Sequence, residues 1–265
     1  MLAFVVSVRP EDVEVASDAL WGLGVVAVEE RGTADGGVEL WTSLGDTDPS
    51  TIDWPVHWPW RLVEIDEAVA DTWREFAQPI VVEPDLVVRP AWVPYDAPAG
   101  TTVLHIEPGS TFGMGDHPTT ILSLRALRRL VMPGCAVLDV GCGSGVLSIG
   151  ACVFGAASAV GVDIAPAAVP VTEANAAANG VADRVQVSTT VLDEVPGTYD
   201  VVAANILAPT LIALADELRR VVAPGGALVI SGILAAAHAH VIEALAPLQV
   251  VATDELDGWV AVTLR

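Results

Sequence analysis

The sequence contains no lysine. Its 12 basic residues are all arginines, and 34 aspartates and glutamates outnumber them, so the formal net charge at pH 7 is −22. Proteins that bind nucleic acid rely on Lys and Arg contacts to phosphates, and a strongly acidic surface repels nucleic acid. The composition therefore excludes direct nucleic-acid binding and favours a basic protein as partner. A general acidic bias that serves only solubility is the alternative.

Long apolar runs and metal-ligand spacings are missing as well. Although 52% of the residues are hydrophobic, charges, Gly and Pro interrupt every run before the roughly 20 residues that a membrane helix needs. Residues 1–9 lack the basic start of a signal peptide. The three cysteines, Cys135, Cys142 and Cys152, are odd in number and have no metal-ligand spacing. These absences predict a cytoplasmic protein with reduced thiols, no membrane contact and no metal site.

Acidic residues and tryptophans are concentrated in the first part of the chain. Residues 1–100 carry 19 acids and 5 arginines (net −14), whereas the remainder carries 15 acids and 7 arginines (net −8). Trp54, Trp58 and Trp60 fall in one expected loop, where they either pack in a core or form a surface for a partner. The first part is therefore the expected docking region for a basic protein.

The first part of the chain also has the element order of a small α+β domain. Alternating apolar residues predict four strands, and a helix that begins at a proline and ends at a glycine separates the first two. The expected strands are 3–8, 25–29, 38–42 and 61–65, and the expected helix is 10–23. This order predicts a reduced ferredoxin-like domain over residues 1–66, without the second helix of that fold. Residues 67–101, with a short helix, two short extended pieces and several prolines, are interpreted as a stiff linker.

Strands alternate with helices over residues 102–265. The expected strands are 103–107, 136–140, 159–162, 184–188, 199–206, 227–231, 249–253 and 259–264. The expected helices are 121–131, 166–179, 211–222 and 235–245, with a further one that starts at Val146. The alternation predicts an α/β domain with a mainly parallel, doubly wound, Rossmann-like sheet, whose last strand is expected to form an antiparallel edge.

A glycine-rich turn lies at the centre of this domain. The buried strand expected at 136–140 contains Asp139 and runs into Gly141, Gly143 and Gly145 before a helix begins. Such a strand-to-helix turn lets a ligand lie directly against the backbone, because residues without Cβ leave room for it. The turn therefore predicts a binding site for a nucleotide-like ligand.

The next strand ends in an acid, Asp163, eighteen residues beyond Gly145. An acid in this place accepts hydrogen bonds from ribose hydroxyls. A dinucleotide fingerprint requires a glycine where Val146 stands, so that ligand does not fit the spacing. The observed D-x-G-x-G-x-G pattern resembles the first motif of S-adenosylmethionine-dependent methyltransferases, with Gly141, Gly143, Gly145 and Asp163 at the cofactor. A glycine-rich turn of another doubly wound protein is the alternative.

Further motifs make the resemblance more specific. Residues 107–120, Glu-Pro-Gly-Ser-Thr-Phe-Gly-Met-Gly-Asp-His-Pro-Thr-Thr, look like the signature of the bacterial ribosomal-protein-L-eleven methyltransferases (PrmA type). The segments 140–147, 162–166, 204–208 and 231–234 resemble the same family in the same order. The resemblance covers residues 71–265 and implies an N-methyltransferase for amino groups, lysine side chains or the N-terminal amine, of a large-subunit ribosomal protein. It also implies that Thr120, Gly141, Asp163 and Asn205 bind S-adenosylmethionine and that the N-terminal domain recognises the substrate.

Asn205 is the candidate catalytic residue. It stands at an expected strand end and resembles the Asn of the Asn-Pro-Pro-Tyr motif of other amino-group methyltransferases. Its side-chain carbonyl and a neighbouring backbone carbonyl would accept the N–H groups of the target amine and aim its lone pair. The alternative is an Asn that caps the following helix. For His117, the only histidine near the motif, packing in the loop is favoured over a role as proton acceptor.

Two other function classes fit parts of the pattern. One is an N-methyltransferase for another protein lysine or for a small amine, and the other is a module that binds the methyl donor without turnover. An amine-orienting Asn205 argues against the second class, because a module without turnover has no use for it. Labelling of whole ribosomal proteins with the methyl donor separates these possibilities.

Overall fold

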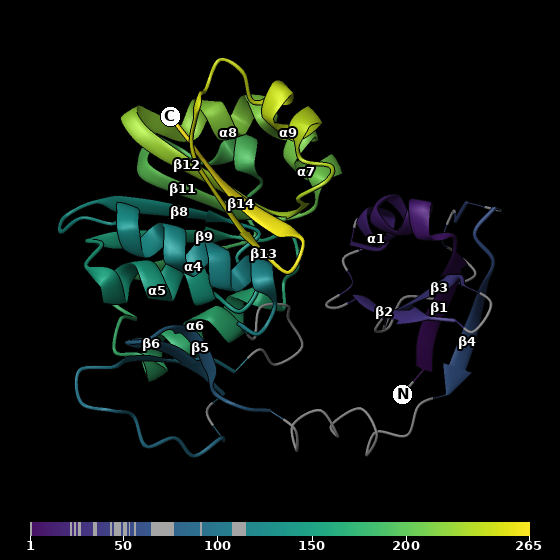
Figure 1. The fold of residues 1–265 in the computed structure, drawn as a ribbon, viewed down its shortest axis with the longest axis horizontal. Coiled ribbons are helices and arrows are strands. Elements are labelled where there is room, and N and C mark those ends of the chain that lie inside the picture. Colours follow the sequence, from purple (N-terminus) through teal and green to yellow (C-terminus); the bar gives the residue numbers. More distant parts are fainter. Residues whose placement is uncertain are drawn as a thin grey trace. The chain divides into compact units, whose positions relative to one another are not determined.

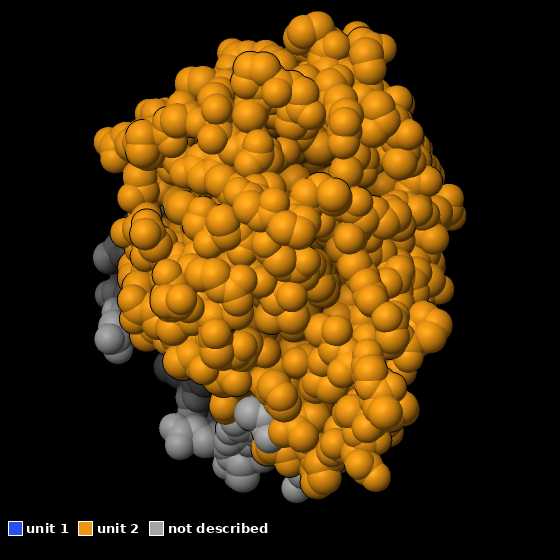
Figure 2. Space-filling view, turned by 90° about the vertical axis from the view of Figure 1, so that its left-hand side faces the viewer, with its two compact units in different colours: residues 1–77 blue, residues 78–265 orange. Residues whose placement is uncertain are grey.

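The computed structural model describes residues 2–21, 23, 25, 28–33, 36–42, 44, 49, 52, 54–55, 57–64, 77–90, 92–107 and 115–265. Contacts between residues divide the chain into two compact units, Met1–Ala77 and Gln78–Arg265. Figure 1 traces both units, and Figure 2 shows one face of the second. None of the helices in these described ranges is long and apolar enough to cross a membrane.

The first unit contains a four-stranded antiparallel sheet of order β2-β3-β1-β4. Its elements are β1 (Leu2–Val8), a 3-10 turn (Pro10–Asp12), α1 (Val13–Trp21), β2 (Val28–Gly32), β3 (Val38–Thr42) and β4 (Trp60–Glu64). Phe4, Val6 and Leu40 of the sheet share one buried cluster with Ala16 and Leu20 of α1. The ferredoxin-like assignment of this unit stays a prediction.

Two of the three clustered tryptophans belong to the core of the first unit. Trp54 and Trp58 are 9% and 6% exposed, and the Trp54 indole donates to the Trp58 carbonyl at 3.2 Å. Trp54 also packs edge-on against Phe4, with ring centroids 5.8 Å apart. Trp60 lies on β4 and is 43% exposed. The partner-surface alternative is therefore wrong for Trp54 and Trp58.

The second unit is built on a seven-stranded sheet of order β10-β9-β8-β11-β12-β14-β13 (Figure 1). Its strands are β8 (Ala136–Val140), β9 (Ser158–Val162), β10 (Val185–Ser188), β11 (Tyr199–Asn205), β12 (Val222–Leu234), β13 (Val250–Leu256) and β14 (Trp259–Leu264). The first five strands in this order are parallel, and β14 is antiparallel to both of its neighbours. This arrangement confirms the doubly wound, Rossmann-like prediction.

The edge strand differs from the prediction. The last strand, β14, is inserted between β12 and β13, so the antiparallel edge is β13. Burial explains the order, because all of β14 after Trp259 is buried whereas most of β13 is exposed. An apolar run of this kind requires a neighbour on each side, and the more polar β13 can face solvent.

Helices cover both faces of the sheet. They are α4 (Pro118–Leu130), α5 (Val146–Phe154), α6 (Ala168–Ala178), α7 (Ala208–Ala213), α8 (Ala215–Val221) and α9 (Ala239–Ala244), with a 3-10 turn at Leu192–Glu194. The core consists of two clusters, one that includes residues of α4 and α5 and another that includes residues of α7, α8 and α9. The single helix expected at 211–222 is instead two short helices that meet at Leu214.

A small sheet of order β5-β6-β7 completes the second unit. Its strands are β5 (Ile80–Glu83), β6 (Leu86–Arg89) and β7 (Thr102–His105). Leu86, Val88 and Leu104 are fully buried in the same cluster as α4 and α5. The range expected as a linker, 67–101, therefore contributes two strands to the second unit.

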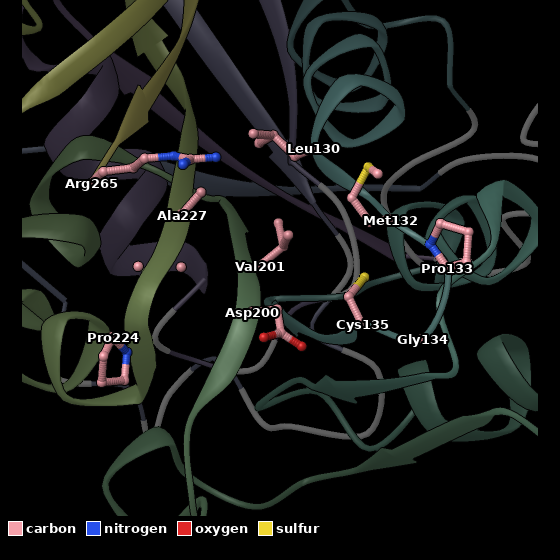
Figure 3. Close-up of a pocket in the computed structure, with 12 residues that line it drawn as sticks. Leu130, Met132, Pro133, Gly134, Cys135, Asp200, Val201, Pro224, Ala227 and Arg265 are labelled. Atoms are coloured by element: carbon pink, nitrogen blue, oxygen red, sulfur yellow. The ribbon is translucent and has the colours of Figure 1, made fainter.

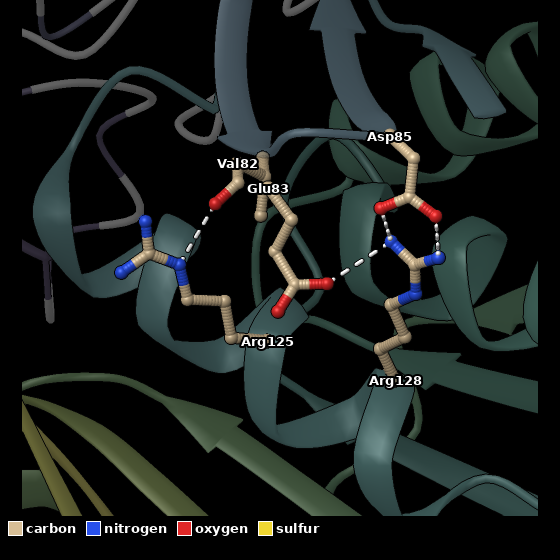
Figure 4. A network of polar contacts seen from close by, with 5 residues as sticks. All are labelled: Val82, Glu83, Asp85, Arg125 and Arg128. Atoms are coloured by element: carbon tan, nitrogen blue, oxygen red, sulfur yellow. Dashed lines mark hydrogen bonds and ion pairs between the residues drawn. The ribbon is translucent and has the colours of Figure 1, made fainter. Parts of the chain in front are cut away.

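Arginines of α4 hold the β5–β6 hairpin (Figure 4). The Arg125 Nε donates to the Val82 carbonyl at 2.8 Å. The Arg128 guanidinium donates to Glu83 at 3.0 Å and, through two nitrogens, to Asp85. The forked geometry of Arg suits such bidentate pairing. The hairpin is thus tied to the helix whose first turn carries Thr120.

Candidate active site

The predicted glycine turn is formed by backbone that only glycine adopts readily. Gly141, Gly143 and Gly145 have φ of +74°, +52° and +78°, a region that is costly for residues with a Cβ. The turn is closed by hydrogen bonds from the Gly141 amide to the Val162 carbonyl and from the Gly145 amide to the Cys142 carbonyl, both at 2.8 Å. The sequence therefore dictates a rigid strand-to-helix turn between β8 and α5.

Gly141 and Gly145 are packed tightly against other parts of the protein. A Cβ on Gly141 would lie 2.4 Å from Cγ2 of Ile206, and a Cβ on Gly145 would lie 2.6 Å from Cγ2 of Thr172. Real Cβ atoms do not approach neighbours so closely. The lack of side chains at Gly141 and Gly145 thus serves the approach of the β11–α7 connection and of α6, and the space beside each Cα is filled by protein atoms.

Asp163 directly follows β9 and joins this strand to the glycine turn. One carboxylate oxygen accepts from the Gly143 amide at 2.8 Å, and the other accepts from the Ala165 amide at 2.9 Å. Each carboxylate oxygen has a second lone pair. Asp163 is therefore positioned as a half-buried acceptor beside the turn, with capacity left for ligand hydroxyls.

Asp139 is a buried carboxylate beneath the turn. Its Oδ2 accepts from the Ser148 amide at 3.0 Å and from the Ser148 hydroxyl at 2.7 Å. Its Oδ1 is buried and has no partner among the residues described. Burial raises the pKa of Asp139 to about 6, while the Ser148 hydrogen bonds act in the opposite direction. An unpaired buried acceptor is costly, and a cationic ligand group would relieve that cost.

Thr120 lies in the first turn of α4 and is 1% exposed. Its hydroxyl is buried and, over the described ranges, has no hydrogen-bond partner. The preceding His117 is the N-cap of α4, since its side chain accepts from the Thr119 amide. Its ring packs edge-on against Trp259 with centroids 4.9 Å apart, and burial lowers its pKa. His117 is therefore a packing and capping residue, in line with the sequence interpretation.

Asn205 is the last residue of β11 and pairs with Ser231 of β12. On the other side, Ala204 pairs with Val140 of β8, so the chain reaches Asn205 next to the start of the glycine turn. The N-cap of α7 is Leu207, and that helix has no side-chain capping bond. Asn205 is therefore not the N-cap residue of α7.

These residues converge because three neighbouring parallel strands end together. β9, β8 and β11 are adjacent in the sheet, and their carboxyl ends carry Asp163, Gly141 and Asn205. The chain order reverses between β8 and β11, which is the place where doubly wound sheets bind ligands. The structure thus brings Asp163, Gly141 and Asn205 together at one edge of the sheet.

Two residues of α6 that brace the turn were not predicted. The Thr172 hydroxyl donates to the Gly143 carbonyl at 3.1 Å. The Asn175 side-chain amide donates to the Ser144 carbonyl at 2.9 Å and to the Glu107 carbonyl at 2.8 Å, and its oxygen accepts from the Glu107 amide. The available signal was the pair of polar side chains at i and i+3 on an alanine-rich helix, Ala168–Ala178.

Apolar side chains at the same edge were also missed. Ile164, directly after Asp163, is 63% exposed, and Val191, which follows β10, is 47% exposed. The two connections are neighbours, because the Asp163 amide donates to the Ser188 carbonyl at the end of β10. Exposed apolar surface beside an acid suits a ligand with a flat ring next to hydroxyls.

A pocket of the second unit lies elsewhere (Figure 3). Its volume is about 420 Å³, and it is lined by residues that precede β8, begin β11, follow β14 or surround the turn before the buried part of β12. Among them are Met132, Asp200, Gly225 and Arg265. This is the amino edge of the sheet, and none of the predicted site residues lines it. Among the side chains in the described ranges, no group of three His, Cys, Asp or Glu is arranged to hold a metal ion. We therefore take the carboxyl edge as the candidate active site.

Comparisons with known proteins point to one family. The family profile "Ribosomal protein L11 methyltransferase (PrmA)" matches residues 37–265. A ribosomal protein L11 methyltransferase of Citrifermentans bemidjiense is 43% identical over 228 residues, which cover 84% of this chain and 74% of that protein. A protein of the same name from Symbiobacterium thermophilum is 39% identical and aligns over 83% and 69% of the two chains. The crystal structure of a ribosomal protein L11 methylase from Lactobacillus delbrueckii subsp. bulgaricus has a TM-score of 0.65 at 29% identity, covering 71% of this chain and 96% of that one.

Proposed function

This chain belongs to the ribosomal protein L11 methyltransferase (PrmA) family, and we propose that it methylates amino groups of a large-subunit ribosomal protein. The observation that carries the proposal is the convergence of Asp163, Gly141 and Asn205 at the carboxyl ends of three adjacent strands. One of these residues suits the ribose of a nucleoside, one belongs to a tight backbone platform, and one suits an incoming amine.

S-adenosylmethionine is the cofactor, and the residues at the carboxyl edge fit it. Asp163 offers acceptors to the ribose hydroxyls, and Ile164 offers an exposed apolar surface to the adenine ring. The Asp139 carboxylate, buried beneath the glycine turn, would attract the cationic methionine end through its charge, and Thr120, in the first turn of α4, would lie near its polar groups. When bound, S-adenosylmethionine supplies a methyl group that its sulfonium already activates.

The remaining task of the protein is to present a neutral amine in line with that methyl group. A lysine ammonium must first lose its proton, which costs roughly 4–5 kcal/mol at pH 7 given an ordinary pKa near 10.4. Asn205 would accept an N–H of the amine with its side-chain oxygen and so aim the nitrogen lone pair. The backbone carbonyl of Ile206, the next residue, is a second acceptor for the same purpose.

The distribution of charge supports a basic protein as substrate. Six arginines of the second unit have protein partners: Arg125, Arg128, Arg129, Arg184, Arg219 and Arg220. Arg184, for example, donates to the carbonyls of Cys152 and Ala156 at the end of α5. Arginines used in this way are not available for phosphates, whereas the net charge of −22 attracts a cationic protein.

We assign substrate recognition to residues 1–66, the more acidic part of the chain. Residues 1–66 carry 13 acids and 3 arginines (net −10), a higher density of negative charge than residues 67–265, which carry 21 acids and 9 arginines (net −12). Attraction between exposed charges is screened within about 10 Å at 0.1 M salt. Methylation of the protein substrate should therefore weaken as salt is added. If the rate of methylation did not change with salt, the acidic residues would serve solubility and not substrate binding.

The test is incubation of the full chain with labelled S-adenosylmethionine and the separated proteins of the large ribosomal subunit. We expect one labelled protein band, with the label on amino groups. Label on free small amines but on no ribosomal protein would support the small-amine alternative. Donor binding by calorimetry without label on any acceptor would support a non-catalytic module. Either result would overturn the proposal.

A further inference from the structure

The residue after the candidate catalytic Asn205 is held from three directions. The Ile206 amide donates to the Ser231 carbonyl at 3.2 Å. Its side chain meets the glycine turn, since a Cβ on Gly141 would lie 2.4 Å from Ile206 Cγ2. Its carbonyl meets a third segment, since a Cβ on Gly232 would lie 2.4 Å from the Ile206 oxygen.

Gly232 owes its position to an irregularity in β12. The pairing of β12 with β14 shifts register between Ile230 and Ile233, and Gly232 has φ of +86° within this interval. The bulge brings the bare Cα of Gly232 against the peptide groups of Ile206, whose oxygen, carbon and nitrogen would be 2.4, 2.8 and 3.1 Å from an added Cβ. Bulges next to active sites re-aim nearby groups. Because Gly232 has no side chain, it affects the site only through the position of the Ile206 backbone against which it packs.

We propose that Gly232 and Gly141 form a two-sided clamp on Ile206 that positions Asn205 and the Ile206 carbonyl for the incoming amine. Both glycines are then positioning residues that act through Ile206. The proposal rests on the proposed function, because it assumes that Asn205 and the carbonyl beside it orient the amine. It also explains how Asn205 and the Ile206 carbonyl are placed precisely. Gly141, just after β8, and Gly232, in β12, each approach Ile206 more closely than a residue with a side chain could.

The two sides of the clamp are chemically different, and this difference makes the proposal testable. Gly141 faces a side-chain atom, Cγ2 of Ile206, which a substitution can remove. Gly232 faces backbone atoms, which no substitution of residue 206 can remove. A change of Ile206 to Leu deletes Cγ2 while nearly preserving side-chain volume. It should relieve a Cβ at position 141 and leave a Cβ at position 232 as harmful as before.

The experiment compares Gly232→Ala with Gly225→Ala. Gly225 also has positive φ, +79°, but an added Cβ there would have no neighbour within 4 Å, so it controls for backbone strain alone. For Gly232→Ala we expect kcat at saturating donor and substrate to fall about 100-fold, the scale of a misplacement near 1 Å. Donor affinity by calorimetry should stay near that of the parent. Gly225→Ala should keep the parent kcat.

The rescue arm uses Gly141→Ala with and without Ile206→Leu. We expect Gly141→Ala to lower kcat and the added Ile206→Leu to restore much of it, whereas Ile206→Leu should restore nothing in Gly232→Ala. Equal kcat values for Gly232→Ala and Gly225→Ala would overturn the clamp. If Gly232→Ala does not fold, the absence of any rescue of Gly141→Ala by Ile206→Leu overturns it.

Asn205→Ala separates this proposal from the proposed function. Full turnover by Asn205→Ala would remove the amine-orienting role and with it the proposed mechanism. Loss of turnover in Asn205→Ala, together with normal turnover in Gly232→Ala, would leave the proposed function standing and remove only the clamp.

Discussion

The two edges of the seven-stranded sheet differ in what they offer a ligand: the amino edge has a pocket, and the carboxyl edge has buried polar groups without partners in the described part of the chain. The amino edge has a pocket of about 420 Å³, but its acid, Asp200, already accepts from the Ala136 amide at 2.8 Å. At the carboxyl edge, buried acceptors on Asp139 and Thr120 lack partners within the described ranges. A hollow alone therefore does not identify the site. Buried unpaired polar groups point to it only together with the converging strand ends, because Ser17 and Trp58 of the first unit also carry such groups.

The largest expected difference in kcat is between substitutions at the two ends of one strand, β11. Asn205 ends this strand at the carboxyl edge, and Asp200 lies near its start at the amino edge. Asn205→Ala should lower kcat about 100-fold or more while donor affinity changes far less, because the lost term is orientation of the amine in the transition state. Steady-state kinetics and calorimetry measure the two effects.

Asp200→Asn is the matched control, since an amide oxygen can still accept from Ala136. It should retain the parent kcat. Equal turnover of Asn205→Ala and Asp200→Asn at saturating donor and substrate would remove the difference between the two edges.

Local sequence patterns are sufficient to predict which residues meet at the carboxyl edge. The positions of Gly141, Gly143 and Gly145 follow from their spacing after an apolar strand, and all three adopt positive φ. Alternation of strands and helices implies parallel strands, and parallel strands bring their carboxyl ends to one edge. The convergence of Asp163 and Asn205 at the turn is therefore predictable without knowledge of any tertiary contact.

The remaining features depend on contacts between distant residues. Gly141 meets Ile206, and Asn175 bonds Glu107, across 65 and 68 positions of sequence. No local periodicity encodes such pairs. The insertion of β14 between β12 and β13 likewise depends on which strand can be buried on both sides. Local sequence patterns therefore predict the helices and strands. Which of these elements lie next to one another depends on how much apolar surface each has to bury.

The second contrast concerns donor binding. Asp163→Ala removes the acceptor for ribose hydroxyls and also the bond to the Gly143 amide. The expected loss of donor binding is about 1.5–3 kcal/mol, typical of hydrogen bonds to a charged group. Asp163→Asn keeps one acceptor oxygen and should lose less. Calorimetry on folded variants that found equal donor affinity for Asp163→Ala and the parent would contradict the assignment.

The third prediction uses pH to test whether the ionised Asp139 carboxylate contributes to donor affinity. Below about pH 6 Asp139 is protonated and neutral, and above it the carboxylate is ionised, because burial raises its pKa. The ionised form favours a cationic donor, so donor affinity should rise with pH. About tenfold weaker binding is expected at pH 5 than at pH 7. Asp139→Asn should bind weakly at both pH values, and a parent protein without this dependence would contradict the role of Asp139.

The fourth prediction compares two asparagines of the α6 region. Asn175 bonds Glu107, two residues after β7, and the Ser144 carbonyl of the glycine turn. Asn179 instead bonds the amide and carbonyl of His105 in β7 and the Asn175 carbonyl of its own helix. Each change to Ala should lower the free energy of unfolding by about 1–3 kcal/mol, because buried partners are left unpaired. Only Asn175→Ala should also weaken donor binding. Denaturant unfolding and calorimetry measure the two effects, and equal donor affinities for the two variants would show that the brace on the turn is dispensable.

The smallest contrast uses two apolar side chains of nearly equal exposure at opposite edges. Ile164, beside Asp163 at the carboxyl edge, is 63% exposed, and Met132, which lines the amino-edge pocket, is 65% exposed. If the adenine ring covers Ile164, Ile164→Ala removes apolar surface that binding would bury. About 1 kcal/mol of donor affinity, or roughly fivefold, should then be lost. Met132→Ala removes a similar exposed surface but should leave donor affinity unchanged, since it lies at the wrong edge. Calorimetry at one temperature decides between these outcomes, and a smaller heat-capacity change for Ile164→Ala would identify the loss as apolar burial. Equal donor affinities for the two variants would mean that the ring lies away from Ile164, while the polar contacts of Asp163 would be unaffected.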